Sequence, residues 1–478
     1  MLHLFTNQTI MLKKIILSAL LSVVTGIVYT NAQNAPVTKV ASWVTHPDRS
    51  ALLEKQTTMP VFVFGKVNDA YPTITVNDNE KYQQIDGFGF TLTGGSATLI
   101  NALKATEKKK LLNELFSTKG KGIGVSYLRI SIGASDLNAE VFTYDDLPAG
   151  ETDPKLGRFS LAKDAEVITL LKEILAINPR IKILGSPWTA PSWMKTNGSS
   201  KGGKLKPDCY NVYGQYLTKY ILAMKARGIR IDAITPQNEP LNPKNNPSMV
   251  MEAAEQAAFI KSSLGPAFHS ASLKTKIITY DHNADRPDYP IDILKDPEAR
   301  KYVDGSAFHM YGGKIEALTE VHNAFPDKNL YFTEQWVGAP GNFAENLNWH
   351  VNTLIIGATR NWARNVLEWN LAADENNLPH TPGGCTECLG AITIEHAITR
   401  NVAYYIIGHA SKFVPAGSVR IASNISGDLA NVAFLTPKGK KVLIAINNGK
   451  TKASFNIRYK KAAAICSHDG GAVGTFVW

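Results

Sequence analysis

AITPQNEP (Ala233–Pro240) and NLYFTEQW (Asn329–Trp336) are two short stretches of one design, in which apolar residues come first and a glutamate follows, Glu239 or Glu334. Such β-branched or aromatic runs, bounded by Gly, Pro, Asn and Asp, are typical of strands. Six further runs of this kind occur along the chain: Gln84–Phe90, Tyr127–Gly133, Lys182–Trp188, Lys276–His282, Gly305–Tyr311 and Val366–Ala372. The sequence therefore predicts eight short strands, several of them ending in polar or aromatic residues.

Helical patterns separate most of these runs. In Ala165–Ala176 and Asn211–Arg227, apolar residues recur at three- and four-residue spacing, as a helix packed on a sheet requires. Eight strands alternating with helices predict an α/β fold, a (β/α)8 TIM barrel. Such a barrel carries its active site at the C-terminal ends of the strands, where Glu239 and Glu334 end the fourth and the seventh.

Both ends of the chain carry period-two patterns, which are typical of half-buried strands. They are Val61–Phe64, Tyr71–Asp78, Leu429–Leu435, Lys441–Asn447, Ala453–Tyr459 and Ala472–Trp478. Hairpin turn signals between the later runs predict a small antiparallel β-sandwich built from both chain ends. An independent sugar-binding tail is the alternative, but the sequence has no Ser/Gly- or Pro-rich linker near Val414–Ser418. The predicted boundaries are 1–32 for a signal peptide, 33–80 for the leading sandwich strands, 81–413 for the barrel and 414–478 for the rest of the sandwich.

The first 32 residues have the layout of a secretory signal. Lys13 and Lys14 precede an uncharged apolar run, Ile15–Tyr29, and the small residues of a cleavage site follow it. Met11 is an alternative start for this signal. A transmembrane helix is the other reading, but the run is shorter than the about 20 residues that a span needs. We therefore expect an exported protein, periplasmic or extracellular.

Composition narrows the classes of partner. The chain has 478 residues, 44% of them hydrophobic, and a formal net charge of +10. This charge could favour anionic polysaccharides or membrane surfaces, but the lysines are scattered and their longest run is Lys108–Lys110, which is more typical of a solvated surface. We expect no nucleic-acid partner and no obligate protein partner.

Four cysteines are present: Cys209, Cys385, Cys388 and Cys466. Cys385 and Cys388 form a C-x-x-C pair, but zinc would need further ligands and a second such pair is missing from the sequence. A local disulfide and two free thiols both stay open for this pair. Cys209 and Cys466 are expected to be unpaired and structural.

The two glutamates suit the cleavage of glycosides. That reaction needs one carboxyl group to protonate the leaving oxygen and a second to attack or screen the anomeric carbon. We assign Glu239 as the general acid/base and Glu334 as the nucleophile, with surface carboxylates as the alternative. For a mechanism that retains the anomeric configuration, the two carboxyl groups should lie about 5–5.5 Å apart.

The ordered motifs of the chain resemble the glucosylceramidase-type glycoside hydrolases of family 30. They are QQIDGFGFTLTGGSA (Gln83–Ala97), LRISIGASDL (Leu128–Leu137), GSPWTAPSWMKTNG (Gly185–Gly198), TPQNEP, FHMYGG, YFTEQW, EWNLAADENN and YYIIGHASKFVPAGSVRI (Tyr404–Ile421). The resemblance covers nearly all of the chain after the signal. It implies a retaining β-glycosidase whose catalytic barrel carries a small β-sandwich.

The resemblance also sharpens the reading of four residues. Arg129 interrupts an apolar strand, where a bare charge is costly, and the family pattern places it beside the nucleophile; a barrel-core salt bridge is the alternative. Asp136 is expected to accept hydrogen bonds from two hydroxyls of glucose rather than to form a turn. Trp188 and Trp369 are expected to stack on the sugar, although single tryptophans often belong to the core.

The remaining expected contacts surround the two glutamates. Asn238 suits a hydrogen bond to the sugar 2-hydroxyl, and Tyr311 suits one to the nucleophile. His309 is expected to support the residues that contact the substrate rather than to act as a proton shuttle. A rim formed by His282, Asn283 and Gln335 completes the predicted site, for which no metal and no cofactor are expected.

The leading interpretation is a secreted retaining β-glucosidase of glucosylceramidase type. The alternatives are an endo-β-1,6-glucanase and a catalytically inactive carbohydrate-binding protein, so the expected partner is a β-glucoside, either glycolipid or β-glucan. Asp136 and the two tryptophans favour a closed, glucose-sized subsite. One departure from many relatives of the ceramide-cleaving branch is Gly94-Gly95, which stands where these carry an acidic residue and leaves the aglycone open.

Overall fold

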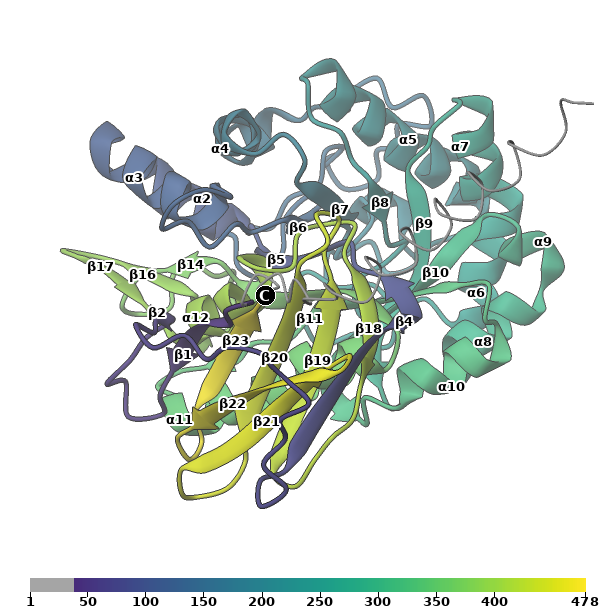
Figure 1. Cartoon of the computed structure of the whole chain (residues 1–478). Helices are drawn as coiled ribbons and strands as arrows, with labels where there is room; N and C mark the ends of the chain where they lie inside the picture. The colour runs from purple at the N-terminus through teal and green to yellow at the C-terminus, as the bar shows by residue number, and fades with distance from the viewer. Residues whose placement is uncertain (1–37) are drawn as a thin grey trace, which may run out of the picture. The chain divides into compact units, whose positions relative to one another are not determined.

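The computed structural model describes residues 38–478, so the predicted signal peptide lies outside the described residues. Eight parallel strands form a closed barrel (Figure 1) in the order β10-β11-β13-β5-β6-β7-β8-β9. Their bounds are β5 Gly87–Thr91, β6 Tyr127–Ser131, β7 Lys182–Ser186, β8 Ala233–Ile234, β9 Lys276–Ala284, β10 Val303–Gly313, β11 Asn329–Glu334 and β13 Ala363–Asn370. Each predicted run contributes one strand, and the predicted (β/α)8 barrel is confirmed.

Helices surround the barrel, and their apolar faces are buried. The two predicted helices are present as α4 (Ala165–Ile177) and α5 (Tyr210–Ala226). In α4 the buried residues follow the three- and four-residue spacing, from Val167 to Ile174. The other helices are α2 Gly94–Ala102, α3 Ala105–Phe116, α6 Ala253–Phe259, α7 Gly265–Ser270, α8 Asp288–Lys295, α9 Pro297–Arg300, α10 Ala317–Ala324, α11 Phe343–His350 and α12 Val402–Ser411.

Two barrel strands end earlier than the sequence pattern indicates. Strand β7 stops at Ser186, before Pro187, and β8 has only two residues, before Thr235 and Pro236. Proline has no backbone N–H to donate to a neighbouring strand, so it ends the ladder. The polar residues of the predicted runs consequently lie on loops just beyond the strand ends, where their side chains are free to turn inward.

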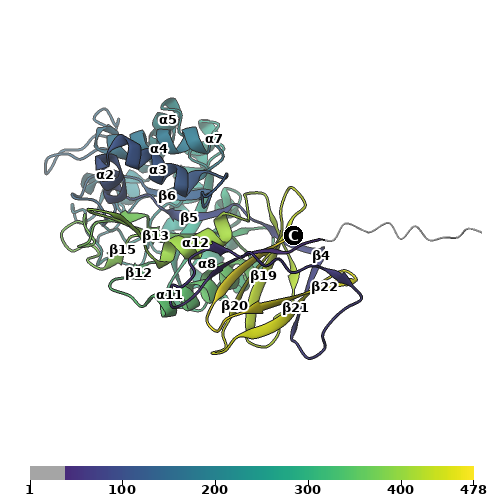
Figure 2. The same ribbon diagram turned by 60° about the vertical axis from the view of Figure 1, so that its left-hand side comes forward.

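The second sheet combines both ends of the chain. Its order is β2-β1-β23-β20-β19-β18-β4-β21-β22-β3. In Figures 1 and 2 the purple strand β4 accordingly lies among the yellow C-terminal strands. The bounds are β1 Ala41–Thr45, β2 Glu54–Lys55, β3 Val63–Phe64, β4 Thr73–Gln84, β18 Val419–Ser423, β19 Leu429–Leu435, β20 Lys441–Asn447, β21 Ala453–Tyr459, β22 Ala462–His468 and β23 Val473–Val477. The predicted sandwich is confirmed, with one parallel pair, β21 and β4, among the antiparallel ones.

The sandwich has two buried faces. One face, with Ile74, Leu443 and Phe455, closes the core of the sandwich itself. The other face, with Phe434 and Ile444, belongs to the same apolar cluster as the barrel and its helices. Because this second face is buried against the barrel, the C-terminal strands form a rigid support rather than a freely hinged module.

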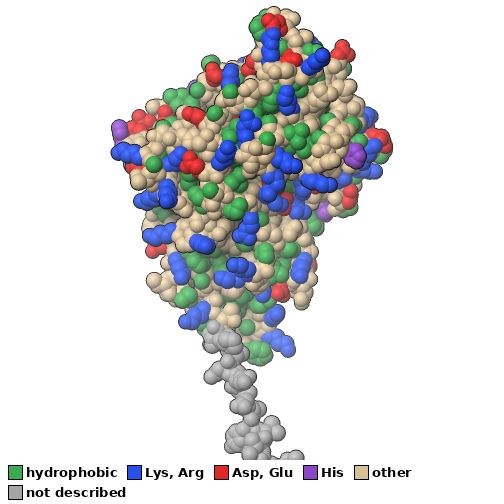
Figure 3. Space-filling model, turned by 90° about the horizontal axis from the view of Figure 1, so that it is seen from above, with side chains coloured by type: hydrophobic (Ala, Val, Ile, Leu, Met, Phe, Trp, Pro, Cys, Tyr) green, Lys and Arg blue, Asp and Glu red, His purple; other side chains and the backbone are tan. Residues whose placement is uncertain are grey.

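Two smaller sheets border the C-terminal end of the barrel. One pairs β12 (Val337–Gly338) with β15 (Cys388–Leu389), and the other joins β14 (Ala372–Ala373), β16 (Ile392–Ile394) and β17 (Ile398–Arg400). Among residues 38–478, none of the helices is both long and apolar enough to cross a membrane. On the face shown in Figure 3, lysine and arginine side chains are scattered among uncharged ones.

Candidate active site

A cavity of about 220 Å³ opens at the C-terminal ends of the barrel strands. It is smaller than the about 300–1,000 Å³ that is typical of sites for drug-sized ligands, and therefore suits a single sugar residue. The cavity brings together residues that lie up to 252 positions apart in the sequence, from Asp136 to Cys388. Its lining is Asp136, Trp188, Asn238, Glu239, Asn245, Tyr311, Glu334, Trp336, Trp369, Cys385 and Cys388.

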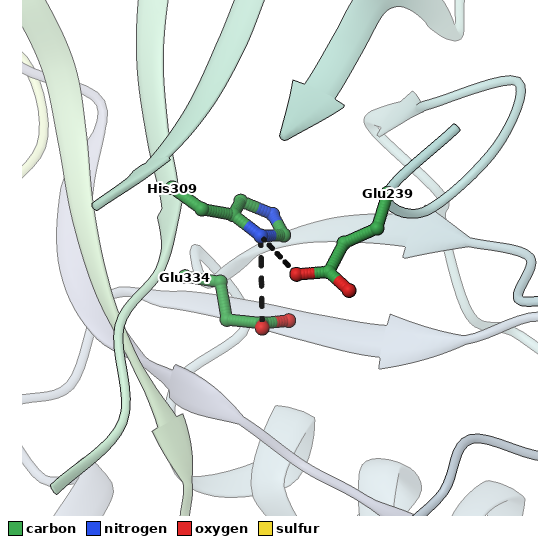
Figure 4. Close-up of side chains that lie close together, drawn as sticks. All are labelled: Glu239, His309 and Glu334. Carbon is green, nitrogen blue, oxygen red and sulfur yellow. Dashed lines mark hydrogen bonds and ion pairs between the residues drawn. The ribbon is translucent and has the colours of Figure 1, made fainter. Parts of the chain in front are cut away.

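The two predicted catalytic glutamates face each other across this cavity. Glu239 follows β8 with a left-handed backbone (φ +44°), and Glu334 is the last residue of β11. The imidazole of His309, from β10, lies between them (Figure 4): its Nδ1 is 3.4 Å from Glu239 Oε1 and 3.6 Å from Glu334 Oε1. This nitrogen and one oxygen of each carboxylate all lie within 4.8 Å of one another. Each side chain is buried.

Arg129 is the cation beside the predicted nucleophile. Its side chain is fully buried and forms an ion pair with Glu334 through Nη1. Its Nη2 donates to Asn238 Oδ1 at 2.6 Å and to Asp281 Oδ2 at 2.9 Å. Tyr311 donates its hydroxyl to Glu334 Oε1 at 3.0 Å, the contact expected of it. Glu334 is therefore held on both oxygens by donors.

Asp281 is the central residue that the sequence reasoning missed. Its carboxylate accepts hydrogen bonds from Arg129, Ser186 (2.7 Å), Thr235 (2.7 Å) and Thr333 (2.6 Å). His309 Nε2 lies 3.0 Å from the Asp281 Oδ1 atom. These contacts hold its pKa well below the usual range despite full burial, with Arg129 as the largest favourable contribution.

Charge within this network determines where protons lie. Burial disfavours a charged His309, but Glu334, Asp281 and Glu239 outweigh it and raise its pKa to about 9. Burial likewise raises the pKa of Glu334, against the opposing effect of His309 and Arg129. For Glu239, the effect of burial is overcome by His309, His282 and Asn242, which lower its pKa to about 2. At neutral pH the proton therefore lies on His309 and Glu239 is ionised.

The same proton bears on metal binding. Glu239, His309 and Glu334 are close enough together to share an ion. However, a protonated imidazole has no free lone pair for a metal, and Glu334 is already paired with Arg129. The arrangement fits two carboxylates that are held by His309 and Arg129 better than it fits a metal centre.

Trp188 and Trp369 line the cavity but present less of their rings than expected. They stack on each other, with ring centroids 5.4 Å apart, and are 1% and 3% exposed. The Arg129 guanidinium lies 4.8 Å from the ring centroid of Trp188. The indole Nε1 of Trp188 is buried without a partner among the described residues, so it is free to donate to a sugar hydroxyl.

Asp136 also lines the cavity and contacts the cysteine pair. Cys385 and Cys388 form a disulfide, which settles the alternative that the sequence left open, whereas Cys209 and Cys466 are free thiols. The Cys385 amide donates to Asp136 Oδ2 at 3.3 Å. Burial, Glu334 and Glu239 raise the pKa of Asp136 to about 7. The Asp136 Oδ1 atom has no hydrogen-bond partner within residues 38–478. Such an atom is suited to accept from a ligand hydroxyl.

The remaining predicted rim residues occupy the edge of the network. His282 and Gln335 are largely buried, and the Asn283 Oδ1 atom accepts from the Tyr311 amide at 3.3 Å. Trp336 and Asn245 line the cavity but were not assigned contacts from the sequence. The Gly94 position is packed so closely that a Cβ there would meet Asn138 Nδ2 at 1.9 Å, so a larger residue at this point would require the Asn138 side chain to move.

A larger cavity, of about 510 Å³, opens at the N-terminal ends of the strands. Several of its charged groups are paired, as in Lys182–Asp86 (2.7 Å) and Arg230–Asp232 (2.7 Å). In TIM barrels this end serves stability, whereas catalytic residues lie at the other. We therefore place the active site in the smaller cavity.

Comparisons with known proteins show the family of the chain. Residues 85–414 match the model of the glycosyl hydrolase family 30 TIM-barrel domain, and residues 417–476 match that of the family 30 β-sandwich domain. The chain is 36% identical over 405 residues to the endo-1,6-beta-D-glucanase neg1 of Aspergillus fumigatus, covering 78% of this chain and 81% of that protein. It is 30% identical over 436 residues to the lysosomal acid glucosylceramidase of Mus musculus, covering 85% and 83%. A solved structure, the endo-beta1,6-glucanase BT3312, superposes with a TM-score of 0.83 at 35% identity and covers 92% of this chain and 99% of that one.

Proposed function

The chain belongs to glycoside hydrolase family 30, and from this premise we propose that it is an exported endo-β-1,6-glucanase that retains the anomeric configuration. The observation that carries the mechanism is the carboxylate pair, because oxygens of Glu239 and Glu334 lie within 4.8 Å of each other. Retaining enzymes separate their carboxyl groups by about 5–5.5 Å, whereas inverting enzymes leave about 6.5–9.5 Å for a water molecule. The spacing favours retention.

In the first step, a Glu334 oxygen attacks the anomeric carbon while the bond to the departing glucosyl oxygen breaks. The proton for that oxygen comes from Glu239. Arg129 and Tyr311 keep Glu334 oriented and favour its ionised form. The product of this step is a glycosyl ester on Glu334.

In the second step, Glu239 removes a proton from water, which attacks the ester and releases a sugar of the original configuration. The neighbours of Glu239 already favour the ionised form that this step needs. The first step needs a proton on Glu239, which is the minor form of this carboxyl group in the free enzyme. Because the two carboxylates titrate together, substrate contacts that exclude water from Glu239 can select this form.

The proposed substrate is based on the relatives of the chain. It favours the alternative from the sequence, an endo-β-1,6-glucanase, over the leading interpretation, a β-glucosidase of glucosylceramidase type. The chain is more similar to endo-1,6-glucanases from three fungi, at 35–37% identity, than to the mouse glucosylceramidase, at 30%. A cavity of about 220 Å³ would take one glucose unit and leave the rest of a glucan on the surface. Export is supported by the N-terminal signal pattern and by the disulfide, because disulfides persist in oxidising compartments.

The test is to incubate the protein, without its signal segment, with linear β-1,6-glucan and separately with glucosylceramide. We expect a ladder of β-1,6-linked oligosaccharides from the glucan, and proton NMR of the first products should show the β-anomer. Release of glucose from the lipid alone would return the assignment to a glucosylceramidase. An α-anomeric first product would exclude retention.

The matched control is Glu334→Gln, which keeps the shape of the side chain and removes its charge. An enzyme loses turnover in this variant, whereas a protein that only binds carbohydrate keeps its affinity for the glucan. Binding of the glucan by both forms with hydrolysis by neither would support the inactive alternative.

A further inference from the structure

The Cys385–Cys388 disulfide is part of the wall of the sugar cavity, although neither catalytic step uses it. Both cysteines line the cavity. Cys388 packs with Leu137, Trp188 and Trp369 in one buried apolar cluster, against which Cys385 also lies. The disulfide therefore touches the surfaces that would enclose the sugar.

The loop that the disulfide closes also holds Asp136. The Cys385 amide donates to Asp136 Oδ2 at 3.3 Å. At Gly384, the residue directly before Cys385, the backbone of the same loop comes so near that a Cβ would lie 2.5 Å from the Asp136 carbonyl oxygen. That carbonyl accepts from the Thr381 amide at 2.8 Å. Side chain and backbone of Asp136 are thus both fixed from residues 381–385.

The far end of the loop is tied to the catalytic strands. Asn370, at the end of β13, donates to the Cys388 carbonyl at 3.2 Å. The Ala339 amide donates to the Glu387 carbonyl at 2.8 Å, beside the pairing of β12 with β15. Residues 386 and 387 are exposed, and the Thr386 carbonyl accepts a hydrogen bond from Asn377 Nδ2 at 3.2 Å. The short segment between Cys385 and Glu387 is therefore held by single hydrogen bonds and by the disulfide, with little packing around it.

We propose that the Cys385–Cys388 disulfide is a positioning element of the sugar subsite, which holds the Cys385 amide on Asp136 and so aims its unpartnered Oδ1 at the substrate. This inference rests on the proposed function, in which Asp136 binds hydroxyls of the glucose unit. Opening the disulfide frees Cys385 from the anchored Cys388, and the buried Asp136 carboxylate then loses a hydrogen-bond donor. The effect should fall on sugar binding, because Glu239 and Glu334 have no contact with this amide.

The first experiment compares the oxidised enzyme with enzyme reduced by dithiothreitol under native conditions. The reagent supplies two electrons and closes to its own cyclic disulfide, while Cys385 and Cys388 become thiols that alkylation and mass spectrometry can count. We expect KM for β-1,6-glucan oligosaccharides to rise about tenfold, as is typical when one hydrogen bond to a charged group is lost. We expect kcat to change by less than about twofold, because the groups that act in the transition state keep their contacts.

Variants separate positioning from general stability. Gly384→Ala keeps the disulfide but pushes the loop away from Asp136, so it should raise KM as reduction does. In an Asp136→Asn background, reduction should change KM by less than about twofold, because residues that act through one contact are not additive. Cys209→Ser is the matched control, since this thiol is free and does not line the cavity. It should leave KM and its response to reduction unchanged.

Each outcome has a definite meaning. An unchanged KM after complete reduction overturns the positioning role, while cleavage of the glucan by the oxidised enzyme keeps the proposed function. Equal effects of reduction in the wild type and in Asp136→Asn also overturn it, because the disulfide would then act by stabilising the fold alone. If the oxidised enzyme does not cleave the glucan, the proposed function fails, and the comparison of KM is made on whichever β-glucoside it hydrolyses.

Discussion

Buried histidines in two regions of the molecule show how neighbouring residues determine charge. His309, among Glu239, Asp281 and Glu334 at the mouth of the barrel, has a pKa raised to about 9 and is charged at neutral pH. His409, on α12, contacts Thr475 (2.9 Å) and Thr45 (2.8 Å) of the sandwich, and burial lowers its pKa to about 3.

His468, on β22, is also fully buried, and burial lowers its pKa to about 4. Neither of its ring nitrogens has a partner within residues 38–478. Equal burial therefore gives opposite charge states, because carboxylates surround one histidine and hydroxyl or apolar groups surround the others. The catalytic region depends on compensated charge, and the supporting region depends on the absence of charge.

The largest effect should come from removing the anion that serves as nucleophile. Glu334→Gln should lower kcat about 10⁴-fold or more, since the covalent step has no substitute. Glu239→Gln should lower kcat by less on an aryl β-glucoside whose leaving group needs no proton, because Glu239 then acts only in the second step. Pre-steady-state kinetics should show a burst of aryl alcohol with Glu239→Gln and none with Glu334→Gln. The reverse pattern would exchange the two roles.

Asp281→Asn tests the compensation that the catalytic region depends on. The change leaves Arg129 and His309 without their shared anion and should lower kcat by about 10²-fold, since both orient catalytic groups. It should also destabilise the fold by about 3–5 kcal/mol, as expected when a buried ion pair loses one partner. Chemical unfolding and steady-state kinetics measure the two effects. A stable, fully active variant would contradict the central place of Asp281.

His309→Gln should move the pH dependence of activity rather than abolish it. The charge on His309 lowers the pKa of both Glu239 and Glu334, so its removal should raise both. Both limbs of the bell-shaped profile of kcat/KM should then shift toward higher pH, because they report the carboxylate pair in the free enzyme. A profile that stays in place would show that His309 is neutral in the working enzyme. His468→Leu is the control, as it lies outside the site and should leave the profile unchanged.

The sequence predicts the barrel well and the catalytic pair by position, but it does not predict Asp281. Alternation along a strand would place Asp281 on the face opposite Tyr280 and His282. In the structure Tyr280 (φ +75°) and Asp281 (φ +63°) both have left-handed backbones, which breaks the alternation and turns the carboxylate into the network. No composition signal in the run KIITYDH indicates this turn.

Contacts between loops that are distant in the sequence could not be predicted from it either. Cys385 and Asp136 are 249 residues apart, and a C-x-x-C pair alone does not indicate which carboxylate its amide meets. The sandwich strands β18 and β22 were missed because the short runs VRIAS and AAAICSH lack the strong alternation of their neighbours. Patterns within one element could thus be predicted, whereas contacts between elements had to come from the fold.

The smallest effect should appear in the supporting region and only in acid. His468 stays neutral in the folded protein down to a pKa of about 4, whereas in the unfolded chain it binds a proton near its ordinary pKa of about 6.5. Below about pH 6.5 the unfolded state therefore binds a proton that the folded state does not bind. The free energy of unfolding then falls by up to about 1.4 kcal/mol for each pH unit.

His468→Leu removes this proton uptake. The variant should consequently lose less stability than the wild type between pH 6.5 and pH 4, while the two have similar activity at pH 7. Thermal unfolding of both proteins across this range is the measurement. Parallel curves would mean that the buried ring is already protonated or hydrated, and that the two histidine regions differ less than their contacts indicate.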